Sequence, residues 1–403
     1  MMTLQEIFRV QESYKLPDAI MEVLLSKEAE KYIRVVKDNK IDIRDTFQEE
    51  QGDRNRLKQD FTPDCLCRLV ADLMKKGSCL DMCSGTGALS KEAARTHNIE
   101  IEEQEYSERT IPFAILDACV NGLTGWISRN DCLRDETYQA YRLTKYQDIS
   151  LPIIEETDRE VGQYNNVIMN PPYSMKFPDA ERYPIVGFTI PKSKADYGFL
   201  LRGLQHLKED GRQIAILPHG VLFRGAGEGK IREWLIKQHL INAVIGLPNK
   251  LFLNTSIPVC ILVIERHSPN ILFIDASQEY IKGSSKNDIS GRQLGKIVDC
   301  FSARTDIERY SRKASYEEIE ENDYNLNIPR YVDTFEEEEL PDIGTMLDNL
   351  DQIEAEERNT RSELYGILGE LTGNAADIRH VKKHQSLMER GRHESTMQTD
   401  TRN

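Results

Sequence analysis

The chain has 403 residues and a formal net charge of −15, and its 39% hydrophobic and 30% charged content is typical of a soluble globular protein. No apolar run approaches the roughly 20 residues that span a bilayer, and the first residues lack a secretory signal, so we expect a cytoplasmic protein with no membrane contact. The acidity disfavours DNA binding through a broadly basic surface, so a local basic groove or a partner would have to supply such contacts.

Residues 1–58 are expected to form a short helical segment, because apolar residues such as Ile20, Val23 and Leu24 have helical spacing. Between residues 59 and 276, short apolar strands alternate with helices. This alternation predicts an α/β fold with a doubly wound, mostly parallel sheet of seven to eight strands. In such sheets, ligands bind at the carboxyl ends of the strands.

The strands and helices of this expected domain can be placed individually. Strands are expected near Ser78–Met82, Ile99–Glu105, Trp126–Asp131, Val167–Asn170, Gln213–Pro218, Asn242–Leu247, Val259–Glu265 and Ile271–Asp275. Helices are expected at Pro63–Lys75, Leu89–Thr96, Glu108–Asn121, Asp196–Lys208 and Glu228–His239.

Three further segments are expected after the domain. Residues 277–340 have a polar, irregular pattern, and residues 374–403 are expected to form a flexible basic tail. Between them, residues 341–373 predict a helix with one apolar stripe, which a partner helix or the chain's own body must cover; we favour a partner. The stripe has heptad spacing with two polar interruptions, at Met346, Leu350, Ile353, Glu357, Thr360, Leu364, Ile367 and Leu371.

The eight cysteines show no spacing that indicates a metal site. Cys65 and Cys67 lie two apart on an expected helix and therefore face different ways, and Cys79 and Cys83 flank the end of the first strand. No nearby set of cysteine and histidine completes four zinc ligands. We expect buried, reduced thiols and no metal.

A glycine-rich turn, Gly85-Thr86-Gly87, follows the first strand and opens a helix, where a ligand can approach the backbone closely. It is not a phosphate loop, because no Gly-Lys-Ser/Thr follows. Asp81, Glu105 and Asp131 end the first three strands in order. They could meet an ammonium group, two ribose hydroxyls and an adenine amino group, respectively. Together these residues predict a site for an adenosyl cofactor.

The motif Asn170-Pro171-Pro172-Tyr173 closes a later apolar strand. The Asn170 side-chain oxygen and the Pro171 carbonyl can accept the two hydrogens of a planar amino group, while the Tyr173 ring stacks on the attached base. Beside an adenosyl site, this motif predicts methyl transfer to an amino nitrogen.

A third motif, Phe61-Thr62-Pro63, precedes the helix that leads into the first strand. Thr62 is expected to be the N-cap of this helix and Pro63 to lie in its first turn. The Phe61 ring could also form a wall for the methionine part of the cofactor.

The order of these motifs resembles that of the amino DNA methyltransferases that form N6-methyladenine. The similarity covers about residues 50–372, although Met82 and Ser84 replace the family's usual Pro and Cys, and the family's large helical N-terminal domain is reduced to some 55 residues. Further stretches are similar to the modification subunit of type I restriction–modification systems, at residues 193–200, 217–225, 244–248, 255–263 and 324–332.

The resemblance implies a Rossmann-like class I methyltransferase fold, S-adenosylmethionine as the methyl donor and adenine in double-stranded DNA as the acceptor. It implies that Asn170, Pro171, Pro172 and Tyr173 handle an extruded adenine. The cofactor contacts that we expect are Phe61, Thr62, Pro63, Asp81, Ser84, Gly85, Thr86, Gly87, Glu105, Asp131, Cys132 and Asn170.

Reading a DNA sequence requires contacts in the major groove, and nothing after residue 264 is large enough for an independent reader. With the negative charge and the helix at residues 341–373, this favours a separate DNA-specificity subunit. The sequence leaves open whether a restriction subunit takes part.

Other functions stay open. A glutamine amide in a protein presents a similar NH2 group, although Phe61-Thr62-Pro63 and an insertion at residues 174–195 speak against that substrate and against RNA. A non-catalytic assembly subunit is the remaining alternative, which intact Asn170 and Asp131 disfavour. The insertion itself is a candidate lid or DNA-backbone contact.

Overall fold

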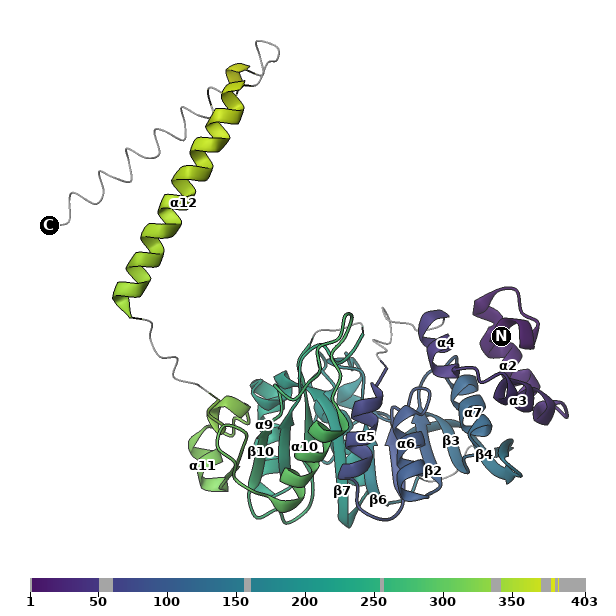
Figure 1. The fold of residues 1–403 in the computed structure, drawn as a ribbon. Coiled ribbons are helices and arrows are strands. Elements are labelled where there is room, and N and C mark those ends of the chain that lie inside the picture. Colours follow the sequence, from purple (N-terminus) through teal and green to yellow (C-terminus); the bar gives the residue numbers. More distant parts are fainter. Residues whose placement is uncertain are drawn as a thin grey trace. The chain divides into compact units, whose positions relative to one another are not determined.

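The chain falls into two units, Met1–Phe335 and Glu336–Asn403 (Figure 1). A computed structural model describes residues 2–50, 61–155, 161–253, 257–334, 342–370, 378–380 and 383. The expected boundaries at residues 58 and 276 lie inside the first unit. Most of the expected basic tail at residues 374–403 lies outside the described residues.

The described part of the first unit is built on one eleven-stranded sheet, in the order β11-β10-β8-β9-β7-β6-β1-β2-β3-β4-β5. All eight expected strands are present. The strands are β1 (Cys79–Met82), β2 (Ile101–Glu105), β3 (Gly125–Asp131), β4 (Glu136–Tyr146), β5 (Ile149–Glu155), β6 (Tyr164–Met169), β7 (Leu207–Pro218), β8 (Ile241–Gly246), β9 (Val259–Ile264), β10 (Ile271–Asp275) and β11 (Ser311–Ala314).

The expectation of seven to eight strands was therefore too low, because β4, β5 and β11 were missed. These strands lie at the two ends of the sheet and have exposed positions, so they lack the continuous apolar run of a strand that is buried on both faces. The sheet is also mixed rather than mostly parallel. Strands β7, β6, β1, β2 and β3 run parallel, whereas β9, β4, β5 and β11 pair antiparallel with their neighbours.

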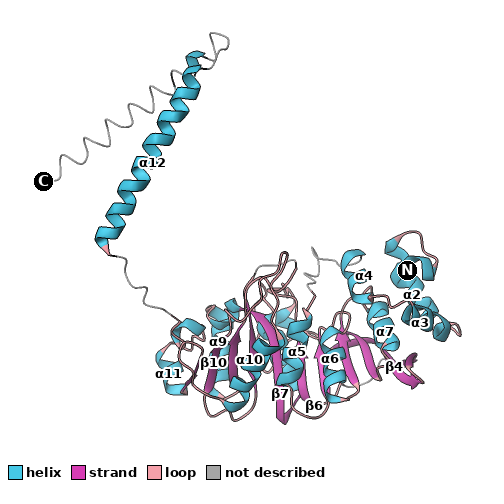
Figure 2. Ribbon diagram, viewed as in Figure 1, coloured by secondary structure: helices cyan, strands magenta, loops and turns pink. Residues whose placement is uncertain are grey.

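Helices cover both faces of the sheet, which confirms the doubly wound α/β arrangement (Figure 2). All five helices expected between residues 63 and 239 are present, as α5 to α9. The helices of this unit are α1 (Leu4–Phe8), α2 (Leu16–Leu24), α3 (Ala29–Asp38), α4 (Ile43–Glu50), α5 (Asp64–Leu73), α6 (Ala88–His97), α7 (Ile111–Val120), α8 (Asp196–Gln205), α9 (Ala226–Lys237), α10 (Gly291–Ala303) and α11 (Tyr316–Glu321).

Alternation along each strand divides the core into two layers. Leu80 and Met82 of β1 pack with α8, α9 and α11, whereas Cys79 packs with α5, α6 and α10 on the other face. A third cluster joins α1 to α4 with α7 and the strands from β2 to β5. The N-terminal helices therefore share a core with the sheet.

The segment at residues 277–340 was expected to be irregular, and this was wrong for its described part. It contains α10, β11 and α11, and it buries Ile297, Phe301 and Leu326. Strand β11 and helix α11 are short, and the longer α10 buries only one stripe of four residues, so apolar residues are sparse along the segment although it packs into the core.

The second unit contains helix α12 (Ile343–Glu370), which lies within the segment 341–373 that was expected to be helical; Leu371 lies outside the described residues. Its apolar residues are exposed: Ile353 and Ile367 have 62% and 63% of their surface accessible.

Candidate active site

Residues far apart in the sequence meet at the carboxyl edge of the sheet's parallel centre. Strands β6, β1, β2 and β3 are parallel neighbours, so the residues that follow them lie along one edge. A cavity of about 310 Å³ lies there. The predicted site residues that line it are Phe61, Thr62, Ser84, Gly85, Thr86, Glu105, Asp131, Cys132, Asn170, Pro171, Pro172 and Tyr173.

Three predicted cofactor contacts, Pro63, Asp81 and Gly87, do not line this cavity. Pro63 is the residue that precedes α5, and Asp81 is fully buried within β1. Gly87 adopts a left-handed conformation with φ of 80°, and a Cβ atom there would lie 2.7 Å from Oε1 of Glu103. These three residues therefore lie outside the cavity lining, next to the residues that form it.

Gly85 differs from Gly87 in what surrounds it. Its φ of 59° also lies in the left-handed region, but a Cβ atom there would meet nothing within 4 Å. The space beside Gly85 belongs to the cavity, whereas Gly87 allows the loop to pack closely on β2. The two glycines thus serve the conformation of one loop for different reasons.

The Glu105 carboxylate holds the glycine loop in place. The N–H of Gly85 donates to its Oε2 at 2.9 Å, and the N–H of Ser107 donates to its Oε1 at 2.7 Å. Burial raises the pKa of this carboxyl, and the backbone N–H groups of Ser107 and Gly85 partly offset the effect. Each oxygen keeps a lone pair for a further donor.

Two more carboxyls, Asp81 and Glu103, are buried under the loop. The N–H of Ser90 donates to Oδ2 of Asp81 at 3.1 Å, and the Ser90 hydroxyl donates to Oε1 of Glu103. Within the described residues, Oδ1 of Asp81 and Oε2 of Glu103 are buried without a hydrogen-bond partner. Burial raises the pKa of Asp81 to about 8 and that of Glu103 well above its usual value.

Asp131 shapes the turn that follows β3. Its Oδ1 accepts the N–H groups of Leu133 and Arg134, each at 3.1 Å. The Arg134 guanidinium lies 3.6 Å from Oδ2 of Asp131 and donates to Asp179 at 2.7 Å. Because Asp179 belongs to the insertion at residues 174–195, Arg134 connects this insertion to the cavity wall.

The Asn170 side chain is held from both sides. Its Nδ2 donates to the Thr62 hydroxyl at 2.9 Å, and its Oδ1 accepts the Tyr173 hydroxyl at 2.7 Å. The expectation that Thr62 caps α5 was wrong: the N-cap is Pro63, and no side chain caps this helix. The Thr62 hydroxyl instead orients the Asn170 amide. The start of α5, near Thr62, and the end of β6, near Asn170, lie close enough for this hydrogen bond.

A buried ionic network fixes the backbone just after Tyr173. Ser174, with φ of 51°, donates its N–H to Oδ1 of Asp196 at 2.8 Å. Arg224 donates to Oδ2 of Asp196 at 2.9 Å and to the Ser174 hydroxyl at 3.2 Å, and it also pairs with Glu228. The unusual backbone conformation at Ser174 is therefore held by fully buried Asp196.

Other lining residues were not predicted. Met175, Lys176, Phe177 and Pro178 come from the insertion, for which a lid role had been considered, and Phe47 comes from α4, where its ring contacts Phe61 with centroids 5.7 Å apart. The remaining unpredicted residues are Cys83, Ala88, Tyr106, Asn130, Leu133, Arg134 and Phe199.

The described residues contain no group of three or more His, Cys, Asp or Glu side chains placed to hold a metal ion. The cysteines described there are free, and most are buried. None of the helices in the described ranges is both long and apolar enough to cross a membrane.

Comparison with known proteins gives a consistent result. The model of the N-6 DNA methylase family matches residues 38–340. The type I restriction enzyme MpnII methylase subunit of Mycoplasma pneumoniae is 31% identical over 51% of this chain and 40% of its own length. The MjaVII methylase subunit of Methanocaldococcus jannaschii is 30% identical over 76% of this chain and 55% of its own length. The chain thus spans about half the length of these curated relatives.

Solved structures agree. The type I restriction–modification methyltransferase subunit from Streptococcus thermophilus superimposes with a TM-score of 0.63 and 31% identity, over 82% of this chain and 76% of that one. A Listeria monocytogenes structure assigned to the class I S-adenosylmethionine-dependent methyltransferases shares the fold at 17% identity, with a TM-score of 0.50, over 74% of this chain and 97% of that one.

Proposed function

Because this chain belongs to the N-6 DNA methylase family, we propose that it transfers a methyl group from S-adenosylmethionine to N6 of adenine in double-stranded DNA. We further propose that it acts as the modification subunit of a type I-like restriction–modification system, as the names of its relatives suggest. The observation that carries the proposal is the Asn170 side chain, held by Thr62 and Tyr173 at the wall of a cavity that Glu105 and Asp131 also line.

The residues around the cavity fit an adenosyl cofactor. The volume of about 310 Å³ is at the lower end of the range for small-molecule sites. Glu105 can accept the ribose hydroxyls with its remaining lone pairs, and Oδ2 of Asp131 can accept an adenine amino group. When bound, the cofactor supplies an electrophilic sulfonium methyl group.

Asn170 and the Pro171 carbonyl would bind the adenine amino group. The N6 lone pair is delocalised into the ring, so the free amino group is a poor nucleophile. Two acceptors on its hydrogens favour a pyramidal nitrogen with a localised lone pair. Thr62 makes this possible, because it engages the amide nitrogen of Asn170 and so directs the amide oxygen towards the turn.

Tyr173 would exchange partners when the base enters. Its hydroxyl occupies Oδ1 of Asn170, the atom assigned to the adenine amino group. Its ring meets Phe252 edge to face, with centroids 6.2 Å apart, so one ring face can stack on an extruded base. Stacking offsets part of the few kcal/mol that extrusion costs.

A DNA-specificity subunit is the partner that we propose for α12. The exposed apolar residues of this helix recur at heptad positions, including Met346, Leu350 and Ile353. An apolar stripe of this spacing is stabilised when another helix packs against it. A chain with a net charge of −15 would also bind DNA more tightly together with a partner that supplies basic contacts to the phosphates.

The proposal can be tested with the purified chain, alone and with a candidate specificity subunit. Unmethylated plasmid DNA is incubated with S-adenosylmethionine, digested to nucleosides and analysed for N6-methyladenine by mass spectrometry. We expect N6-methyladenine with the wild type and none with Asn170→Ala. A glutamine-containing protein substrate serves as the competing acceptor. Methylation of that protein but not of DNA would refute the assigned substrate.

A further inference from the structure

Phe223 lies at the same edge of the sheet as the Asn170–Tyr173 turn. Strands β6 and β7 are parallel neighbours; Asn170 follows β6, and a short 3-10 helix (His219–Leu222) follows β7 and ends next to Phe223. The adjacent Arg224 donates to the Ser174 hydroxyl and to Asp196. Phe223 is thus one residue from the group that holds the end of the turn.

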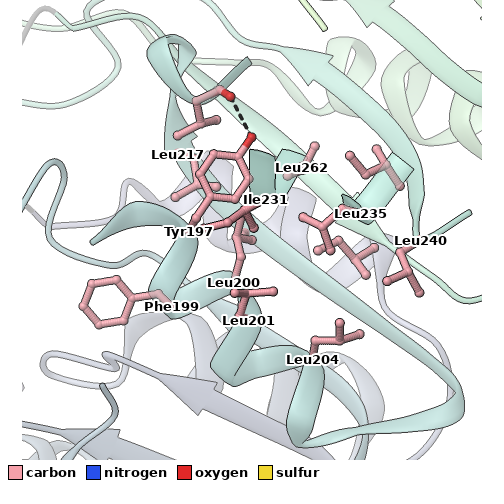
Figure 3. Packing of buried hydrophobic residues seen from close by; sticks show 14 of the residues in the cluster. Tyr197, Phe199, Leu200, Leu201, Leu204, Leu217, Ile231, Leu235, Leu240 and Leu262 are labelled. Carbon is pink, nitrogen blue, oxygen red and sulfur yellow. Dashed lines mark hydrogen bonds between the residues drawn. The ribbon is translucent and has the colours of Figure 1, made fainter. Parts of the chain in front are cut away.

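The backbone on both sides of Phe223 is firmly anchored. The carbonyl of Val221 accepts the Tyr197 hydroxyl at 2.8 Å, and the Arg232 guanidinium donates to the carbonyls of Val221 and Arg224 at 3.2 and 2.8 Å. Figure 3 shows the Tyr197 side chain packed among leucines of the core, with its hydroxyl bond as a dashed line. A fully buried tyrosine and a buried arginine therefore support this segment.

The Phe223 ring itself points out of the core. It is 48% exposed, which makes it the most exposed of the phenylalanines that the structure describes. Leu253, on the loop between β8 and β9 at the same edge, is 50% exposed, and its neighbour Phe252 contacts Tyr173. A large apolar side chain such as Phe223, on an anchored segment beside the proposed site for an extruded base, suits contact with base faces rather than with phosphates.

We propose that Phe223 inserts into the DNA base stack and fills the gap that the extruded adenine leaves. This inference rests on the proposed function. The physical reason is that extrusion unstacks neighbouring bases and costs a few kcal/mol, which an apolar wedge between base pairs partly offsets. Anchoring by Tyr197 and Arg232 keeps the loss of freedom on binding small, and the exposed aromatic face can stack on either neighbouring base.

The test compares Phe223→Ala with Phe223→Leu, which keeps apolar volume, and with Ile153→Ala as a control. Ile153 is 51% exposed but lies on β5 at the far end of the sheet. The DNA substrate is a duplex carrying a sequence that long-read mapping shows to be methylated by the wild-type complex. A second duplex is identical except for an abasic site opposite the target adenine, which makes extrusion easier.

We expect Phe223→Ala to lower kcat/KM on the paired duplex about 10- to 100-fold, with a much smaller loss on the abasic duplex. Phe223→Leu should recover most of the activity, Ile153→Ala should match the wild type, and cofactor affinity should be unchanged in all. An unchanged rate for Phe223→Ala, or an equal loss on both duplexes, would overturn the inference while the wild type still methylates adenine. If the wild type methylates no adenine, the proposed function itself fails.

Discussion

The Asn170–Tyr173 turn and the glycine loop at residues 83–87 follow neighbouring strands, β6 and β1, but their polar groups are satisfied differently. In the turn, both polar atoms of the Asn170 side chain have protein partners, and Asp196 fixes Ser174 behind it. Under the loop, Asp81 and Glu103 each keep a buried oxygen without a hydrogen-bond partner among the described residues.

The two regions therefore differ in how far their polar groups are hydrogen-bonded before a ligand binds. The turn is organised in advance, so a substrate group only has to replace the Tyr173 hydroxyl at one oxygen. Beneath the loop lie instead two carboxyls whose burial is only partly compensated, which raises their pKa values and favours their protonated forms. We therefore expect substitutions in the turn to lower turnover, and substitutions in or under the loop to change stability or cofactor binding.

The largest effect is expected from Asn170→Ala in the turn. Removal of the amide takes away one of the two acceptors that we propose for the adenine amino group, so kcat should fall by at least about 10³-fold. The dissociation constant of S-adenosylmethionine, measured by calorimetry, should change less than about threefold, because we place the cofactor mainly against the glycine loop. Substantial turnover by this variant would contradict the role that we give to Asn170.

The second effect concerns pH and the buried Asp81 carboxyl. Its pKa is about 8 in the folded chain, so the folded state holds a proton that the unfolded state has lost above about pH 4. The stability that this proton contributes is complete below about pH 4 and is lost as pH rises to about 8, by up to about 1.4 kcal/mol per pH unit.

Asp81→Asn isolates this contribution, because the amide does not titrate but can still accept the Ser90 N–H. The free energy of unfolding of wild type minus variant, from urea titrations between pH 5 and pH 8, should therefore fall with pH. A flat difference would mean that Asp81 is ionised in the folded chain.

The third prediction uses the two glycines of the loop as a matched pair. Each adopts a left-handed φ, so an alanine at either position should destabilise the chain by about 1 kcal/mol. At Gly87 the added Cβ would also press on the Glu103 carboxyl, so Gly87→Ala should cost about 2–3 kcal/mol in all. Gly85→Ala should instead weaken cofactor binding, because its Cβ enters the cavity. Equal losses of stability would show that the Glu103 side chain can move away from the added Cβ at little energetic cost.

The residues at strand ends could be predicted from the sequence, because parallel strands bring their carboxyl ends to one edge. Gly85, Glu105, Asp131 and Asn170 all line the cavity for this reason. Asp81 was placed at the right strand, but alternation and burial direct its carboxyl to the start of α6 rather than into the cavity. Their roles as cofactor and base contacts stay predictions.

The parts that sequence patterns missed depend on contacts between distant segments. Phe47 reaches the cavity because α4 packs on α7 and Phe61, which no local pattern of residues 43–50 indicates. The Thr62 hydroxyl was assigned to the nearest helix, whereas its partner is Asn170, more than 100 residues away. Strands β4, β5 and β11 were missed because they lie at or next to an edge of the sheet, where partly exposed strands have weak apolar patterns.

The fourth prediction tests the orientation of the Asn170 amide. Thr62→Val keeps the shape of the side chain but removes the acceptor for Nδ2, so the amide loses a fixed orientation. We expect kcat to fall about tenfold, the equivalent of one hydrogen bond, with little change in cofactor affinity. Thr62→Ser restores the hydroxyl and should recover activity. A loss of cofactor affinity without a loss in kcat would mean that Thr62 contributes to cofactor binding rather than to the orientation of Asn170.

The smallest effect is expected from Tyr173→Phe. In the proposed mechanism, the hydroxyl occupies Oδ1 of Asn170 only until an adenine amino group takes its place, whereas the ring provides the stacking surface in either state. Because Asn170 lines the cavity rather than the core, loss of the hydroxyl should cost little stability. We therefore expect kcat/KM within about threefold of the wild type in the same methylation assay. A tenfold or larger decrease would mean that the Tyr173 hydroxyl acts on the substrate. The turn would then not be fully organised before the substrate binds.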